Sequence, residues 1–264
     1  MIGRFRGKAL LLGLPLALAA AACSGTQPGN TQPGAAPPTD GVAASSVASA
    51  DPSAGAKGSF DSSAFGTAEI SNPYLPFKPG ARWRYGCVTE DGPEERTVAV
   101  THETRQVAGV QAILVRLTAS RKGQLQEEVL AAYAQDRAGN VWYLGEDVKE
   151  YGNGRLAGTK GSWQAGEDGA GAGIVMMAEP RVGDSYHQEN RPGIAQDQAE
   201  VLSLSERVKV TFGGFQQVIK TKEFTPLEPD RLDHKFYARN VGLVLEEAAA
   251  GGQERCELVE MAGG

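Results

Sequence analysis

Three carboxylates lie close together in the middle of the chain, at Glu146, Asp147 and Glu150. A pair of carboxylates can hydrolyse glycosidic bonds if the fold holds the two groups at a suitable separation. On a regular strand Glu146 and Glu150 would share one face, whereas Asp147 would point to the other. This spacing keeps a hydrolase of envelope polymers as one hypothesis, although a solvated strand edge explains the same residues without any chemistry.

The histidines give no pattern for a metal site. His102, His187 and His234 are not spaced as in HxH or HExxH motifs, and the sequence contains no CxxC pair. Residues 136–140 could be mistaken for a calcium loop, but they contain two oxygen-bearing side chains, too few for calcium. We therefore predict no metal and no cofactor.

Motifs for a nucleophile or a phosphate site are also missing. The sequence has no GxSxG element. Residues 169–173, with the sequence GAGAG, have the glycines of a phosphate loop but lack the Lys-Ser/Thr that should follow them. We predict that this segment is a mobile surface loop and that the protein is not an enzyme.

Aromatic side chains are the remaining candidates for a binding site. A curved sheet could gather some of them around a cleft, and clefts of this kind bind apolar or sugar-like ligands. The alternative, which we favour for any single residue, is that the rings fill the core of the sheet. The candidates for a ligand-binding wall are Trp142, Tyr143, Trp163 and Tyr186.

The elements that must position these residues are predicted to be strands. Residues 125–135 and 141–151 flank the connector DRAGN, whose Asp, Gly and Asn tolerate the conformations of a reversing chain. Trp142 and Leu144 would point to one face of the second strand, and Val141 and Tyr143 to the other. This hairpin is the centre of the predicted fold.

Runs with the same alternation of apolar and polar residues occur along the rest of the chain. They follow one another at intervals too short for crossover helices, so they predict an antiparallel meander. Residues 194–204 could be a helix or a strand, and we favour a strand. We predict an all-β fold with about 11–12 strands that form a curved sheet or incomplete barrel, with few or no helices.

The N-terminus has the features of an export signal. Arg4, Arg6 and Lys8 precede an uncharged run over residues 9–22, and small residues follow before Cys23. The run AAACS resembles the lipobox of bacterial lipoproteins, although Ala20 stands where that family prefers Leu. The resemblance implies that Cys23 is acylated and becomes the mature N-terminus. Secretion without lipidation is the alternative.

Three regions follow from this interpretation. We expect a signal peptide at residues 1–22, an acylated cysteine with a disordered tether at residues 23–70, and a single β domain at residues 71–264. The tether is rich in Ser, Gly, Thr, Pro and Ala, and such segments cannot bury enough apolar surface to fold. A flexible coil of about 40 residues spans roughly 35 Å. Phe60 and Phe65 could dock on the domain or remain part of the tether.

Export also bears on the two remaining cysteines, Cys87 and Cys256. Each lies in a strand-like run, one near the start and one near the end of the predicted domain. In an oxidising compartment an even pair of cysteines indicates a disulfide, so we predict a bond between them. It would stabilise the fold by on the order of 4–5 kcal/mol in the chain-entropy model. Two buried free thiols are the alternative.

The charge balance limits the partners. Removal of residues 1–22 takes away three basic side chains and leaves 23 basic and 32 acidic ones, a formal net charge of −9. Such a chain lacks the basic surface that nucleic acid or anionic lipid would require. We expect a monomer that is held at the membrane by its lipid anchor. An envelope protein or an apolar or sugar-like molecule is the expected ligand.

Three segments carry a resemblance to a protein family. The sequences NPYLPFKPGARWRY, YAQDRAGNVWYLGEDVKEY and HKFYARNVGLV resemble those of uncharacterised secreted or lipid-anchored bacterial proteins with β-rich single domains. The resemblance implies export and a β fold. It implies no reaction and no catalytic residue, because the family has none assigned.

The function that we predict is that of a non-catalytic, lipid-anchored envelope protein that binds a ligand or partner or serves as a scaffold. It would lie at the outer membrane if the organism has one. A carrier that holds a lipid in an incomplete barrel and the envelope hydrolase are the alternatives. A dry apolar cavity would favour the carrier, convergent buried acids the hydrolase, and a filled core the scaffold.

Overall fold

A computed structural model describes residues 59–263. Within this range the chain is almost entirely β-strand, and its helical element is the three-residue 3-10 turn η1 (Ser62–Ala64). In the same residues no helix has the length and apolar character needed to cross a bilayer. The predicted signal peptide, Cys23 and most of the predicted tether lie outside the described residues.

Short turns join most of the strands into hairpins. At Lys122-Gly123 and at Asn153-Gly154 both residues have positive φ, and this geometry matches the twist of paired strands. The strands are β1 (Arg82–Thr89), β2 (Gly92–Val107), β3 (Val110–Arg121), β4 (Gln124–Gln135), β5 (Val141–Gly152), β6 (Arg155–Gly158), β7 (Trp163–Gln164), β8 (Gly171–Met176), β9 (Ser185–His187), β10 (Glu189–Asn190), β11 (Gln198–Val210), β12 (Gly213–Phe224), β13 (Leu232–Ala238), β14 (Gly242–Ala250) and β15 (Arg255–Ala262).

All strands belong to one antiparallel sheet with the order β10-β8-β5-β4-β3-β2-β1-β15-β14-β13-β12-β11-β9, and β6 and β7 also pair with β5. The first and last strands of the meander, β1 and β15, lie side by side in the middle of this order. Their register places Cys87 opposite Cys256, and the two residues form the predicted disulfide. The bond therefore joins the two halves of the sheet.

The two ends of the sheet meet in a segment that we call the seam (Ser185–Asn190). It contributes β9 to one end of the strand order and β10 to the other, with Gln188 alone between them. The sheet is not closed into a barrel, because β9 pairs with β11 and β10 pairs with β8, whereas β9 and β10 do not pair with each other.

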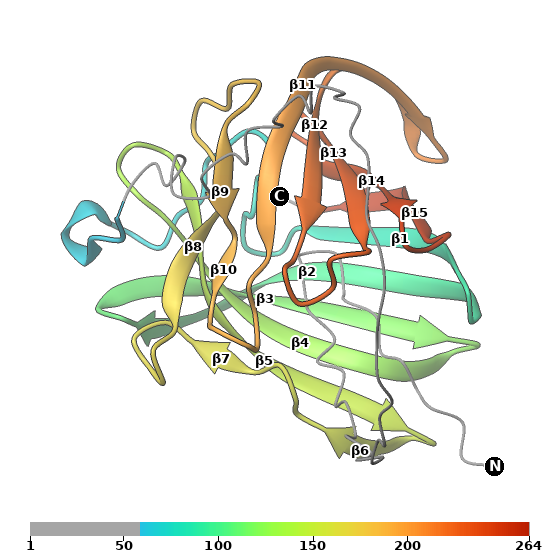
Figure 1. The fold of residues 1–264 in the computed structure, drawn as a ribbon, viewed down its shortest axis with the longest axis horizontal. Coiled ribbons are helices and arrows are strands. Elements are labelled where there is room, and N and C mark those ends of the chain that lie inside the picture. Colours follow the sequence, from blue (N-terminus) through green and yellow to red (C-terminus); the bar gives the residue numbers. More distant parts are fainter. Residues whose placement is uncertain (1–58, 264) are drawn as a thin grey trace, which may run out of the picture. The chain divides into compact units, whose positions relative to one another are not determined.

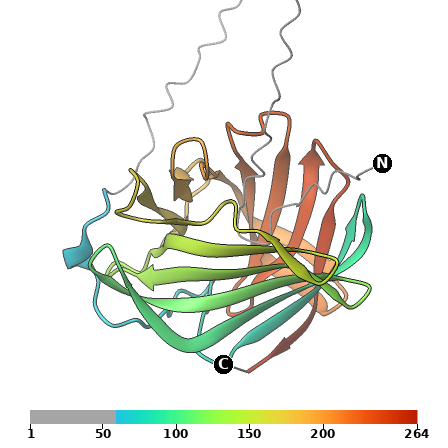
Figure 2. The ribbon, with the colours of Figure 1, turned by 90° about the horizontal axis from the view of Figure 1, so that it is seen from below.

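The two halves of the sheet run across each other. Figures 1 and 2 show the strands β2–β5, in green, crossing the direction of the strands β11–β14, in orange to red. One hydrophobic cluster contains buried side chains from both halves, including Tyr133 and Tyr143 from the first and Val218 and Tyr237 from the second. The inward side chains of both halves thus form a shared core.

The predicted fold class is confirmed: the described chain is all-β and forms an incomplete barrel. The structure has 15 strands, more than the predicted 11–12, and several of them are short, such as β6, β9 and β10. The strand favoured for residues 194–204 begins later, at Gln198. It continues without a break to Val210 as β11.

The predicted mobile loop at residues 169–173 is wrong in part. Gly171 to Gly173 belong to β8, which pairs with β5 and β10. A Cβ atom at Gly173 would lie 2.2 Å from the carbonyl oxygen of Gln188, so the glycine permits close contact with the seam. The glycines of this segment therefore serve packing between strands.

The packed chain begins before residue 71. The rings of Phe60 and Phe65 lie 5.7 and 6.1 Å from that of Trp142, and Phe65 forms a β-bridge with Asp136. Ile70 is 1% exposed. Residues 59–70 thus cover one face of the central hairpin.

Candidate functional site

A bulge in the central hairpin decides where its carboxylates point. Tyr133 pairs with Tyr143 and Ala132 with Gly145, which leaves Leu144 without a partner on β4. The extra residue reverses the alternation, so that Glu146 lies on the same face as Tyr143. The predicted solvated edge is therefore wrong for Glu146, which is 2% exposed, although Asp147 is exposed.

Glu146 is held in the interior by its neighbours on the same strand and on β7. The hydroxyl of Tyr143 forms a hydrogen bond with Glu146 Oε2. Gly145 allows β7 to approach, since a Cβ atom there would lie 2.4 Å from the carbonyl oxygen of Trp163. Burial raises the pKa of Glu146 well above its ordinary value. This shift favours the protonated form of the carboxyl group.

A second buried carboxyl group lies on the seam, at Glu189. Its side chain is fully buried, and neither of its carboxyl oxygens has a hydrogen-bond partner among residues 59–263. Burial, and after it the charges of Asp197 and Glu146, raise the pKa of Glu189. The backbone nitrogens of Gln188 and Glu189 both donate to the Asp197 carbonyl oxygen, at 2.8 and 3.2 Å. Glu146, Glu189 and Asp197 are called the inner acids below.

Asp197 differs from the other inner acids because part of its residue surface is exposed. Its Oδ1 atom is nevertheless closed to solvent and has no partner in the described chain. Burial raises the pKa of Asp197 to about 7, and the positive charge of Lys235 opposes the rise. The inner acids therefore come from β5, from the seam and from the residue before β11, and they converge where the two ends of the sheet meet.

Lys235 on β13 supplies a buried positive charge that acts on Glu189 and Asp197. It is 2% exposed, and its Nζ atom lies 2.6 Å from Glu223 Oε2 and 4.0 Å from Glu246 Oε1. Thr221 and Tyr237 donate to Glu223 Oε1 at 3.0 and 3.2 Å. Burial by itself would lower the pKa of Lys235, but the two carboxylates raise it above its ordinary value. The lysine therefore stays charged.

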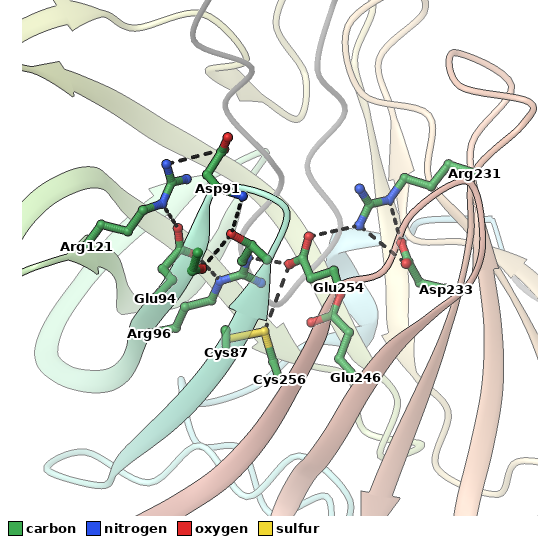
Figure 3. A network of polar contacts seen from close by, with 12 residues as sticks. Cys87, Asp91, Glu94, Arg96, Arg121, Arg231, Asp233, Glu246, Glu254 and Cys256 are labelled. Carbon is green, nitrogen blue, oxygen red and sulfur yellow. Dashed lines mark hydrogen bonds and ion pairs between the residues drawn. A yellow bond between two sulfur atoms is a disulfide. The ribbon is translucent and has the colours of Figure 1, made fainter.

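Figure 3 shows a further group of buried and half-buried charges beside the disulfide, which we call the arginine network (Glu94, Arg96, Arg231, Asp233 and Glu254). Arg96 is fully buried, and it donates to Glu94 Oε1 at 2.7 Å and to Glu254 Oε1. Arg231 lies 3.5 Å from Glu254 Oε2 and donates to Asp233 at 2.8 Å. Opposite charges are thus neutralised across the junction of β2, β13 and β15.

The four aromatic residues predicted for a ligand-binding wall are all buried, with 1–5% of their surface exposed. Tyr143 and Trp163 lie together, with ring centroids 5.4 Å apart. Trp142 lies on the other side of β5, where it packs with Phe60 and Phe65 and donates to Asp136. Tyr186 lies on the seam. Their role in binding a ligand stays a prediction.

One small cavity lies in the apolar core. It has a volume of about 20 Å³ and is lined by side chains that include Phe77, Trp83, Tyr85 and Leu243. This volume is close to the space that one water molecule needs. Drug-sized and lipid-sized ligands require pockets of roughly 300–1,000 Å³. The cavity is thus too small for an acyl chain.

Several polar residues of the interior were not predicted, although their positions follow the strand period. Arg96 has the same parity as the inward residues Val98 and Val100, and Lys235 has that of Tyr237. The sequence signal that could have identified them is a charged residue at a position where the alternation of the strand points inward. The three histidines are exposed or half-buried, and no group of three or more His, Cys, Asp or Glu among residues 59–263 could hold a metal ion.

Comparisons with known proteins give a likeness of fold only. No family model matches the sequence, and no curated protein matches it. Two solved structures are similar. One is a candidate exported protein with a YmcC-like fold from Bacteroides fragilis, with 15% identity and a TM-score of 0.37, covering 72% of this chain and 98% of the other.

The second similar structure is a candidate lipoprotein from Parabacteroides distasonis. It has 14% identity and a TM-score of 0.39, and the match covers 72% of this chain and 99% of the other. Likenesses of this size give no information on substrate, partner or activity. The function must therefore be inferred from the residues of this chain.

Proposed function

We propose that the protein is exported, held in the cell envelope by an acylated Cys23, and acts as a non-catalytic binding or scaffold module through the outer surface of its β domain. The packing of the predicted aromatic wall inside the described β domain is the observation that supports this proposal. The predicted aromatic wall is 1–5% exposed, and the cavity in the core has a volume of about 20 Å³. A partner would therefore be recognised by exposed strands and turns.

Fractionation of cells tests the anchor. Wild-type protein should be found in the membrane fraction and should incorporate labelled fatty acid. The Cys23→Ala variant should lose the label and appear in the soluble fraction, because the acyl chains supply the hydrophobic energy of attachment. The variant Ser24→Ala, which keeps the cysteine, is the matched control. Membrane retention of the unlabelled Cys23→Ala protein would contradict the anchor.

Native purification from membranes, followed by mass spectrometry of whatever proteins and small molecules come with the chain, tests the binding role. Crosslinking before lysis should give contacts on exposed residues of the β domain. Recovery of a stoichiometric apolar ligand from the interior would contradict the proposal and favour the carrier.

A hydrolase is the second candidate, and the inner acids are the observation that favours it. Carboxyl groups with raised pKa values can act as general acids. Glu146 and Glu189 are 2% and 0% exposed, so a substrate could reach them only after the seam had separated from β8 or β11. Release of soluble fragments from purified envelope polymers by wild-type protein, but not by Glu146→Gln, would establish this candidate. Equal inactivity of both proteins would exclude it for those polymers.

A further inference from the structure

The seam holds the two ends of the sheet together with very short strands. β9 has three residues and pairs with β11, whereas β10 has two residues and pairs with β8. Figure 1 shows both strands beside β8 and β11. The backbone nitrogens of Gln188 and Glu189 share one further acceptor, the Asp197 carbonyl oxygen. The junction is therefore much shorter than that of β2 and β3, which have 16 and 12 residues.

A glycine with positive φ lies on each side of the seam. Gly183 has a φ of 88° and Gly193 a φ of 73°, and a Cβ atom at either position would meet no other atom within 4 Å. Both glycines are exposed. Positions of this kind can absorb the change in backbone angles when a segment moves away from its neighbours. The seam is thus bounded by two turns at which it can swing.

The interior side of the seam carries a carboxyl group without a partner. Glu189 is 0% exposed, and neither of its carboxyl oxygens accepts a hydrogen bond from residues 59–263. Three negative charges act on it, from Asp197 before β11, Glu146 on β5 and Glu223 on β12. The positive charge of Lys235 on β13 acts in the other direction. Acidic groups thus outnumber basic groups around this carboxyl group.

The remaining titratable groups near Glu189 add no positive charge. Tyr133 on β4 and Tyr143 on β5 face it, and burial, followed by the nearby carboxyl groups, raises the pKa of both hydroxyls. His187 on β9 is exposed. β8, which pairs with β10, has the sequence GAGIVM and contains no titratable side chain.

The basic residues of the region are engaged elsewhere. Arg191 follows the seam, and its guanidinium donates to the Ser162 carbonyl oxygen at 2.5 Å and to Asp168 at 3.4 Å. Lys235 lies 2.6 Å from Glu223 Oε2. Neither side chain therefore forms an ion pair with the carboxyl group of the seam.

An ionised Glu189 would be costly in the closed sheet. A carboxylate that is buried without a hydrogen-bond donor loses its hydration, and this cost disappears once the segment separates from its neighbours and water enters. Burial raises the pKa of Glu189 and of the other inner acids in the closed state. Their contribution to closure is therefore present below the ordinary pKa values of these acids and is lost as the pH rises through the raised values.

We propose that the seam is a pH-sensitive closure of the sheet, which opens by separation from β8 and β11 when Glu189 and the other inner acids lose their protons. Gly183 and Gly193 bound the segment that moves. Opening gives water a route to the inner acids, while the pairing of β1 with β15 and the disulfide keep the two halves of the sheet joined. The closure depends neither on the lipid anchor nor on a binding partner.

Hydrogen exchange of backbone amides tests the closure. In the mature full chain, the amides of Gln188 and Glu189 report opening, because their acceptor on Asp197 lies outside the seam. Their protection factors, corrected for the intrinsic effect of pH on exchange, should fall between pH 5 and pH 8 by about tenfold per pH unit for each acid that ionises on opening. Amides between β2 and β3 should be better protected at each pH and should respond more strongly to low urea, since local opening exposes less surface than unfolding.

The variant Glu189→Gln should lower this pH dependence by about tenfold per pH unit, because glutamine keeps the shape of the side chain and does not ionise. Glu179→Gln is the matched control, at an exposed position between β8 and β9, and its seam amides should behave as in wild-type protein. Glu146→Gln is a second variant, on β5, and it should also lower the pH dependence.

Three results would overturn the closure. Protection of the Gln188 and Glu189 amides equal to that of the β2–β3 amides would show that the seam opens only when the whole domain unfolds. Lower protection that does not change with pH would show that the inner acids do not control the opening. A wild-type pH dependence in both Glu189→Gln and Glu146→Gln would assign the titration to other groups.

Discussion

Buried charges are the main feature of this protein at the scale of single residues. Glu189 has no partner for either carboxyl oxygen within the described chain, whereas Arg96 is enclosed by two carboxylates. An interior charge is tolerated when it is neutralised by a proton or by an ion of opposite sign. Burial raises the pKa of each inner acid and so favours the first route, whereas the arginine network follows the second.

The pH dependence of stability should report the titration of a further buried acid, Glu246 on β14. Burial raises the pKa of Glu246 from 4.5 to about 7, so the folded state binds a proton that the unfolded state has lost in this range. Its contribution to the free energy of unfolding is present below pH 4.5 and is lost as the pH rises through about 7. For this group alone, stability should fall by about 2–3 kcal/mol between pH 5 and pH 8.

The variant Glu246→Gln should lose less stability than wild-type protein between pH 5 and pH 8, because glutamine cannot ionise. Urea denaturation at pH 5, 6.5 and 8 measures the effect, and Glu103→Gln, at an exposed position, is the control. An unchanged pH slope in Glu246→Gln would contradict the protonated state of the buried group.

Arg96→Met should destabilise the fold by about 3–5 kcal/mol, since it leaves the carboxylates of Glu94 and Glu254 in the interior without this partner. Arg84→Met is the matched control, because Arg84 also contacts two carboxylates, but its side chain is 41% exposed. We expect little change in its denaturation midpoint. If both substitutions lowered the free energy of unfolding equally, burial of the arginine network would not determine how much it contributes to stability.

At the scale of elements, the pairing of β1 with β15 joins the two halves of the sheet. The disulfide between Cys87 and Cys256 spans a sequence separation of 169 residues at this junction. The bulge at Leu144 is the second feature at this scale. It turns the side chain of Glu146 toward the interior. Both features arise from contacts between strands and not within one strand.

The double variant Cys87→Ala/Cys256→Ala should lower the free energy of unfolding by about 2–5 kcal/mol. The reason is that the open chain gains conformational freedom in the unfolded state. Denaturation of the variant and of wild-type protein with and without reductant measures the difference. Reductant should affect wild-type protein only, and an unchanged midpoint in the variant would exclude a stabilising role of the bond.

At the scale of the whole molecule, the fold depends on strands that are far apart in the sequence. β15 lies between β1 and β14, and it also carries the cysteine of the disulfide. The sheet can therefore be completed only when the end of the chain is available. Folds dominated by such long-range pairings form slowly, because long loops must close before the contacts stabilise them.

Truncation after Gly252 should abolish cooperative unfolding, because it removes β15 and leaves the edges of β1 and β14 unpaired. Deletion of β6, which pairs with β5 alone, is the control and should leave a folded protein. Near-ultraviolet circular dichroism and limited proteolysis distinguish the two results. A protease-resistant truncated chain would show that the two halves of the sheet fold independently.

The sequence by itself determined the local structure and the pairing of the cysteines. Alternation over residues 141–151 and the turn residues around Gly139 predicted the hairpin that the structure contains as β4–β5. These signals are local, since side chains alternate along each strand and few residues adopt positive φ. The lipid anchor lies outside the described residues and stays a prediction.

Only the tertiary structure decided which polar residues lie inside. Regular alternation would place Glu146 on the face of Trp142, but the unpaired residue Leu144 reverses that face. Glu189 faces the interior because two distant ends of the sheet share the seam. Bulges and the closing of a sheet depend on partners far away in the sequence, and no local pattern contains that information.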